Sequence, residues 1–130
     1  MSQENLELVR RAIEAFNRRE LWLDWLDPEV EWVEDPRYPG AQTFHGPPGV
    51  QQSLEKWWDA WSEITMQVEE VIDLGDQVVI AGHTRARGHD SEVVLTGSFG
   101  GVYEFRGGKV VRVQVCGSRA EAMEAVGLRE

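Results

Sequence analysis

The sequence feature that most constrains the fold is an almost unbroken run of strand-like alternation between residues 77 and 116. It predicts three strands, Gln77–Gly88, Glu92–Arg106 and Lys109–Cys116, separated only by short turns rich in glycine or polar residues. Connections this short join antiparallel neighbours. In the middle strand the odd-numbered positions are apolar or glycine and many even-numbered positions are polar, so the sheet has one apolar face that helices must cover.

The rest of the chain supplies those helices and two further strands. In chain order the pattern predicts a helix from Ser2 to about Arg18, a short helix at Glu20–Leu26, a strand at Val30–Pro36, a helix that begins at Pro47, a strand at Thr65–Asp73 and a short helix after Ser118. We therefore expect one α+β domain over residues 1–130. Its cone-shaped, curved mixed sheet would have about five strands, with three N-terminal helices across it and a short C-terminal helix.

Composition and charge restrict the partners of this domain. A formal net charge of -10 opposes binding to nucleic acid phosphates or to an anionic membrane surface. No apolar run approaches the roughly 20 residues that span a bilayer, and the residues after Met1 do not form a secretory signal. Cys116 is the single cysteine, which excludes an internal disulfide and suits a reducing compartment. We expect a cytoplasmic protein.

Two glycines on the apolar face of the middle strand point to a cavity. Gly97 and Gly101 stand where a packed core would normally place side chains, and glycine inside a strand marks a bend or a close backbone approach. Helices that cross a curved sheet leave a cone whose wide end is open. Large indoles can line such a space or fill it, and the sequence leaves both readings open. The apolar stripe of the helix that begins at Pro47 is mostly indole: Val50, Leu54, Trp57, Trp58 and Trp61.

Three polar residues are candidates for chemistry in that space. Asp35 ends the first strand beside Trp32, and a carboxylate in apolar surroundings becomes a better proton acceptor. Asp35 can equally cap the turn before Pro36. His83 and Arg85 share a strand face, but both faces of that strand are apolar further along, so the pattern does not decide whether they point inward or into solvent.

Metal or cofactor chemistry is not indicated by the sequence. The three histidines, His45, His83 and His89, lack metal-ligand spacing, and no glycine-rich turn precedes a helix in the way that a phosphate-binding loop requires. We expect no metal and no cofactor.

Several segments together resemble the SnoaL-like branch of the nuclear transport factor 2 superfamily, over essentially the whole chain. They are Val9–Asn17, Leu26–Trp32, Gly46–Val50 and Phe105–Val111. The resemblance implies a cone-shaped α+β barrel, usually dimeric, with a pocket between the helices and the curved sheet. Relatives include polyketide cyclases, ketosteroid isomerases, scytalone dehydratase, limonene epoxide hydrolase and non-catalytic binding domains. The homodimer would form through Thr96, Ser98, Arg112 and Gln114.

The same resemblance assigns roles to individual residues. Val33–Pro36 is similar to the strand end that carries the general base of ketosteroid isomerases, which implies that Asp35 is a base and that His83 and Arg85 point inward. The two hydrogen-bond donors of those enzymes fall at Ala12 and Gly101, so steroid isomerisation is not expected. SnoaL-type cyclases place an aspartate on the last long strand, whereas Val111–Val115 contains no carboxylate.

Three functions therefore stay open. The first is a cofactor-independent enzyme, of cyclase, isomerase, dehydratase or hydrolase type, in which Asp35 is the base and His83 or Arg85 holds the reacting oxygen of a small apolar substrate with a ring. The second is a protein that binds such a molecule without reaction, and the third is a dimeric interaction module with a filled interior. In the first two, the predicted pocket walls are Phe16, Trp32, Trp57, Trp58, Trp61, Phe99 and Tyr103.

Overall fold

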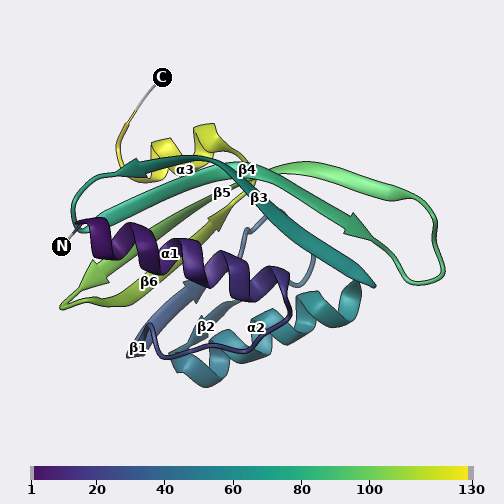
Figure 1. Ribbon diagram of the computed structural model, residues 1–130, viewed down its shortest axis with the longest axis horizontal. Coiled ribbons are helices and arrows are strands. Elements are labelled where there is room, and N and C mark those ends of the chain that lie inside the picture. Colours follow the sequence, from purple (N-terminus) through teal and green to yellow (C-terminus); the bar gives the residue numbers. More distant parts are fainter. Residues whose placement is uncertain (1, 129–130) are drawn as a thin grey trace.

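The computed structural model describes residues 2–128 as one six-stranded curved sheet with three helices. Figure 1 shows α1 and α2 on one side of the sheet and α3 on the other. The α+β prediction is confirmed, and the sheet has six strands where about five were expected. In chain order the elements are α1 Ser2–Asn17, β1 Leu26–Val33, β2 Thr43–His45, α2 Gly46–Ala60, β3 Glu63–Asp73, β4 Gln77–Arg87, β5 Val94–Arg106, β6 Lys109–Cys116 and α3 Arg119–Ala125.

The sheet has the strand order β2-β1-β6-β5-β4-β3. The predicted meander β4-β5-β6 is antiparallel throughout, while β1 runs parallel to β6, which makes the sheet mixed. At the centre of this arrangement Tyr103 on β5 lies opposite Val78 on β4 and Val113 on β6. None of the helices within residues 2–128 has the length and apolar character needed to cross a membrane.

The two faces of β5 are buried by different helices. Phe99, Tyr103 and Phe105 belong to the main core, which includes Val9 and Ile13 of α1, so the odd-numbered face lies under the N-terminal helices as predicted. We call this the concave face. The opposite, convex face was expected to be polar. Over part of its area it packs instead against α3, in a cluster of Val79, Val102, Cys116, Ala122 and Met123.

The predicted short helix at Glu20–Leu26 is wrong, so two N-terminal helices cover the sheet instead of three. The chain leaves α1 through Arg19, which has the left-handed value φ = 57°, and crosses the concave side without a further helix. The backbone N–H of Val110 donates to the Trp25 carbonyl at 3.0 Å, and Leu26 pairs with Val110 on β6. In a segment of seven residues, the spacing of Trp22 and Trp25 cannot distinguish a helix from an irregular segment whose two indoles pack inward.

Most of the remaining predicted boundaries are close to those observed, but the strand predicted at Val30–Pro36 is found at Leu26–Val33. The Ser118 hydroxyl accepts a hydrogen bond from the backbone N–H of Glu121 at 3.2 Å, so Ser118 is the N-cap of α3, the short helix predicted after it. Two prolines occupy the first turn of α2, where no backbone N–H is needed. The short strand β2 lies between the predicted strand Val30–Pro36 and the predicted helix that begins at Pro47, where no element was expected, and it pairs with β1.

Candidate functional site

The concave face and the helices enclose a cavity of about 140 Å³. It is bounded by α1, α2, the segment between α1 and β1, and strands β1, β3, β4, β5 and β6. The predicted wall residues that line it are Phe16, Trp32, Trp57, Phe99 and Tyr103. Trp22, Trp25, Tyr38 and the rim residue Glu20 also line it, and sequence reasoning missed them because they lie on irregular segments that have no periodic pattern.

Gly101 explains why the cavity is open where the strands curve. A Cβ atom at this position would lie 3.4 Å from Ile80 Cγ1 and 3.4 Å from Tyr103 Cε1, which is ordinary van der Waals contact. The space is therefore available and no side chain fills it. Gly100 differs, because a Cβ there would overlap the Ser118 carbonyl oxygen and lie 3.0 Å from the Ala122 Cβ. Gly101 thus leaves room for the cavity, whereas Gly100 lets α3 approach the convex face.

An aromatic corner forms one wall of the cavity. The Trp25 ring lies between two others, with its centroid 6.1 Å from that of Tyr103 and 6.5 Å from that of Trp32. Trp25 is fixed by its own indole N–H, which donates to the Trp22 carbonyl at 2.7 Å. These separations are those of favourable aromatic pairs. The corner is therefore an angled aromatic wall that a ring can contact.

Two of the predicted wall residues lie elsewhere. Trp58 is buried beside Ile64 and Ala86, and its indole N–H donates to the Phe16 carbonyl at 3.2 Å. Trp61, the residue after α2, packs at the edge of the same cluster. Neither lines the cavity. The two indoles stabilise the contact between α2 and the sheet. For these two residues, the indoles of the helix therefore fill space and do not line a cavity.

Two polar groups on the aromatic corner have no hydrogen-bond partner among the described residues. The Tyr103 hydroxyl and the Trp32 indole N–H make no hydrogen bond within residues 2–128, although both residues are more than nine-tenths buried. No side-chain nitrogen or oxygen in that part of the chain is both sealed from solvent and unpaired. Both groups therefore keep some contact with solvent, and both residues line the cavity. Burial raises the pKa of Tyr103, so its hydroxyl stays a neutral donor.

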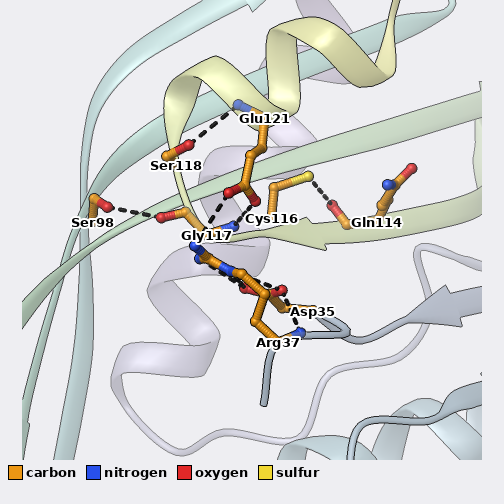
Figure 2. A network of polar contacts seen from close by, with 8 residues as sticks. All are labelled: Asp35, Arg37, Ser98, Gln114, Cys116, Gly117, Ser118 and Glu121. Atoms are coloured by element: carbon orange, nitrogen blue, oxygen red, sulfur yellow. Dashed lines mark hydrogen bonds and ion pairs between the residues drawn. The ribbon is translucent and has the colours of Figure 1, made fainter.

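Asp35 does not end β1 as predicted; it is buried two residues beyond the strand, and it does not line the cavity. Its carboxylate accepts the backbone N–H of Arg37 at 3.0 Å and pairs with the Arg37 guanidinium at 3.1 Å (Figure 2). The predicted turn cap is therefore present. The same guanidinium reaches Glu121 at 3.1 Å, and Glu121 in turn accepts the N–H of Gly117 at 3.1 Å. This network ties the segment after β1 to α3.

The segment held by this network carries part of the cavity rim. Tyr38 follows Arg37 directly, lines the cavity, and meets Trp57 edge-on with ring centroids 5.2 Å apart. Cys116 lies close to the same carboxylates. Burial raises the pKa of its thiol to about 11, and the negative charges of Glu121 and Asp35 act in the same direction. Cys116 is therefore a protonated thiol at neutral pH and a poor nucleophile.

His83 and Arg85 do not point into the cone, which corrects the inward placement that the resemblance implied. Ile80 and Thr84 line the cavity, and strand alternation puts odd-numbered residues of β4 on the opposite face, as Val79 against α3 confirms. His83 is exposed and its Nδ1 lies 2.7 Å from Glu69 Oε1. Arg85 is also exposed. On the convex face neither residue reaches a molecule bound in the cavity.

Glu34 is a buried carboxylate that the sequence did not single out. It accepts hydrogen bonds from Ser53 at 2.6 Å, from Lys56 at 2.5 Å and from the Trp57 indole at 3.3 Å. Burial alone would raise the pKa of Glu34. The hydrogen bonds from Lys56 and Ser53, a further one from the Gln42 N–H and the positive charge of Lys56 together outweigh burial, so the pKa is lowered. Glu34 therefore joins β1 to α2 as an ionised structural group.

The cavity itself carries little charge. Among the residues that line it there is no lysine, arginine or histidine, and Glu20 at the exposed rim is the one carboxylate. Within residues 2–128, no group of three or more histidine, cysteine, aspartate or glutamate side chains is placed to hold a metal ion. The site can enclose a flat apolar body and donate hydrogen bonds to it.

Comparison with known proteins identifies the family. The model of the SnoaL-like domain matches residues 9–113. The chain belongs to this SnoaL-like family. This agrees with the resemblance read from the sequence, and the structure has the cone fold of the nuclear transport factor 2-like proteins.

Solved structures of SnoaL-like and related proteins cover nearly the whole chain. An NTF2-like protein of unknown function from Burkholderia pseudomallei is 26% identical, with 95% of this chain and 98% of that chain covered and a TM-score of 0.79. TerC, co-crystallised with polyporic acid, is 23% identical over 93% and 96% of the two chains, with a TM-score of 0.76. A protein assigned as a SnoaL-like polyketide cyclase from Jannaschia sp. CCS1 is 14% identical over 88% and 85%, with a TM-score of 0.76. No curated protein matches the sequence.

Proposed function

We propose that this SnoaL-like domain binds a small, mainly apolar molecule with one ring in the cavity under α1 and α2. The observation that carries the proposal is the cavity of about 140 Å³ beside Gly101, walled by the aromatic corner. An apolar cavity of roughly 150 Å³ in another protein admits benzene or xenon, so a single ring fits this volume. The fold neighbour TerC was co-crystallised with polyporic acid, which supports a small-molecule role for such a cone.

Binding without reaction is the function that the cavity favours. Proton transfer requires a base within hydrogen-bond reach of the substrate. Asp35, the predicted base, is paired with Arg37 and does not line the cavity, and the predicted oxygen-binding residues His83 and Arg85 lie on the convex face. A bound molecule would thus meet aromatic walls and hydrogen-bond donors, and the one carboxylate among the lining residues is Glu20 at the exposed rim.

A proton-transfer enzyme is the second candidate, and one observation favours it. The charge of Asp35 acts on Cys116, which is among the residues that line the cavity. The carboxylate is therefore near the cavity wall. It could take a proton from a substrate only after separating from Arg37.

Deuterium exchange separates the two candidates. Acetophenone is a single-ring ketone whose methyl protons are weakly acidic, and its exchange in D₂O can be followed by proton NMR. We expect saturable binding, seen as a change in tryptophan fluorescence, with no exchange above the buffer rate. Exchange that the protein accelerates and that the Asp35→Asn variant loses would establish the enzyme instead. Absence of binding for acetophenone and for its hydrocarbon analogue cumene would contradict the proposed cavity function.

A further inference from the structure

We propose that the cavity selects an uncharged ligand with a hydrogen-bond acceptor oxygen, such as an aromatic ketone, and that the Tyr103 hydroxyl donates to this oxygen. The inference rests on the proposed function and names the ligand class for the same cavity. Its basis is the Tyr103 hydroxyl, which makes no hydrogen bond within residues 2–128 and belongs to a residue that lines the cavity; the Trp32 indole N–H, on the other side of the Trp25 ring, is a second such donor.

Leaving these donors unpaired in an occupied cavity is energetically costly. The hydroxyl of Tyr103 and the indole N–H of Trp32 belong to side chains that are only 6% and 8% exposed. A hydrocarbon that displaced water from the cavity would leave both groups without an acceptor, and an unmade hydrogen bond in a buried place is costly. A ligand with an oxygen at the aromatic corner removes that cost. The cavity should therefore distinguish a ketone from a hydrocarbon of the same shape.

The cavity also disfavours a charged ligand. A carboxylate or phosphate would bring an acceptor oxygen too, but it would also bring a negative charge into an apolar cavity without a lining lysine, arginine or histidine. Glu20 at the rim opposes it further, and the Arg37 guanidinium is already paired with the Asp35 and Glu121 carboxylates. A buried charge without a counter-ion is strongly disfavoured. The ligand that fits both conditions is neutral.

Three ligands of nearly equal shape test this selection. Acetophenone has a neutral carbonyl oxygen, cumene replaces it with a methyl group, and benzoate carries a charged pair of oxygens. Titrations followed by tryptophan fluorescence or calorimetry should place acetophenone about 5- to 10-fold tighter than cumene, and benzoate at least about 10-fold weaker than acetophenone. Equal affinity for cumene and acetophenone, or benzoate binding as tightly as the ketone, would overturn the inference while leaving the cavity function intact. Failure of all three to bind would overturn the cavity function itself.

One variant assigns the effect to one hydroxyl. Tyr103→Phe removes the hydroxyl on the aromatic corner and keeps the ring, and cumene, which accepts no hydrogen bond, is the matched control ligand. We expect Tyr103→Phe to lose about 5-fold in acetophenone affinity without loss for cumene. The infrared carbonyl stretch of acetophenone should shift to lower frequency on binding, and less so in Tyr103→Phe. An unshifted carbonyl stretch in the unmodified protein contradicts the inference, whether or not the variant folds.

Discussion

Two adjacent glycines give a quantitative test of where the cavity lies. Gly101 on the concave face and Gly100 on the convex face occupy the same strand, and neither has a positive φ. Replacing each with alanine therefore adds the same methyl group in two different surroundings. At Gly101 the nearest atoms, on Ile80 and Tyr103, are 3.4 Å away, so the methyl fits into cavity space.

The two substitutions should change the free energy of unfolding in opposite directions. Alanine restricts the unfolded chain, which contributes about 0.4–1 kcal/mol, and burial of one methyl group contributes up to about 0.8 kcal/mol. Gly101→Ala should therefore raise the free energy of unfolding by about 1 kcal/mol, or the melting temperature by about 3 °C for a chain of this size. Gly100→Ala places its methyl against Ser118 backbone atoms and the Ala122 Cβ, so α3 must shift. Such overpacking costs about 1–3 kcal/mol.

Urea unfolding of the two variants, followed by circular dichroism, gives both free energies directly. Gly101→Ala should also weaken acetophenone binding, because the methyl takes up part of the about 140 Å³ available. A loss of more than about 1 kcal/mol in Gly101→Ala would mean that the concave side is already filled. A Gly100→Ala variant as stable as the unmodified protein would mean that α3 does not pack on the convex face as described.

Three further predictions concern the ion pairs of Glu34, the ion pairs of Arg37 and the oligomeric state. The pKa of Glu34 is lowered from its ordinary value of 4.5, so the unfolded chain takes up the proton first and stability is lost as the pH falls from about 4.5 through the folded pKa. Urea titrations at pH 7 and pH 3.5 should show that the unmodified protein loses more unfolding free energy between the two pH values than the Glu34→Gln variant does. Equal losses in the two proteins would contradict this. Arg37→Met removes the ion pairs that hold the rim segment, so acetophenone should associate and dissociate faster in stopped-flow fluorescence; unchanged rates would contradict a role in holding the rim. We also expect a homodimer through the exposed part of the convex face, including Arg112, and sedimentation of a monomer alone at high concentration would refute it.

Much of the fold follows from patterns that the sequence shows locally. The antiparallel meander β4-β5-β6 is predicted to within two residues, because alternation over eight or more residues and short turns leave few alternatives. The short segment at Glu20–Leu26 was mispredicted, since its conformation depends on pairing between Leu26 and Val110 on a distant strand. Strand β2 has three residues and is defined only by its partner β1.

The candidate site was predictable in its walls and not in its polar groups. Phe99 and Tyr103 follow from strand alternation together with the apolar face, so their place in the cavity could be read from the sequence. His83 and Arg85 could not be oriented, because both faces of β4 are buried further along, one under α1 and one under α3. The pairing of Asp35 with Arg37 is local in sequence, but its link to Glu121 exists only once α3 has folded onto the sheet.

The central claim is an open, apolar cavity beneath the N-terminal helices, and a crystal under xenon pressure tests it most directly. Xenon enters apolar cavities of this size without needing a hydrogen bond. The account predicts a xenon atom between the aromatic corner and Gly101, in contact with Phe99 or Tyr103. Side chains that fill the space beside Gly101, with no xenon bound there under pressure, would contradict it.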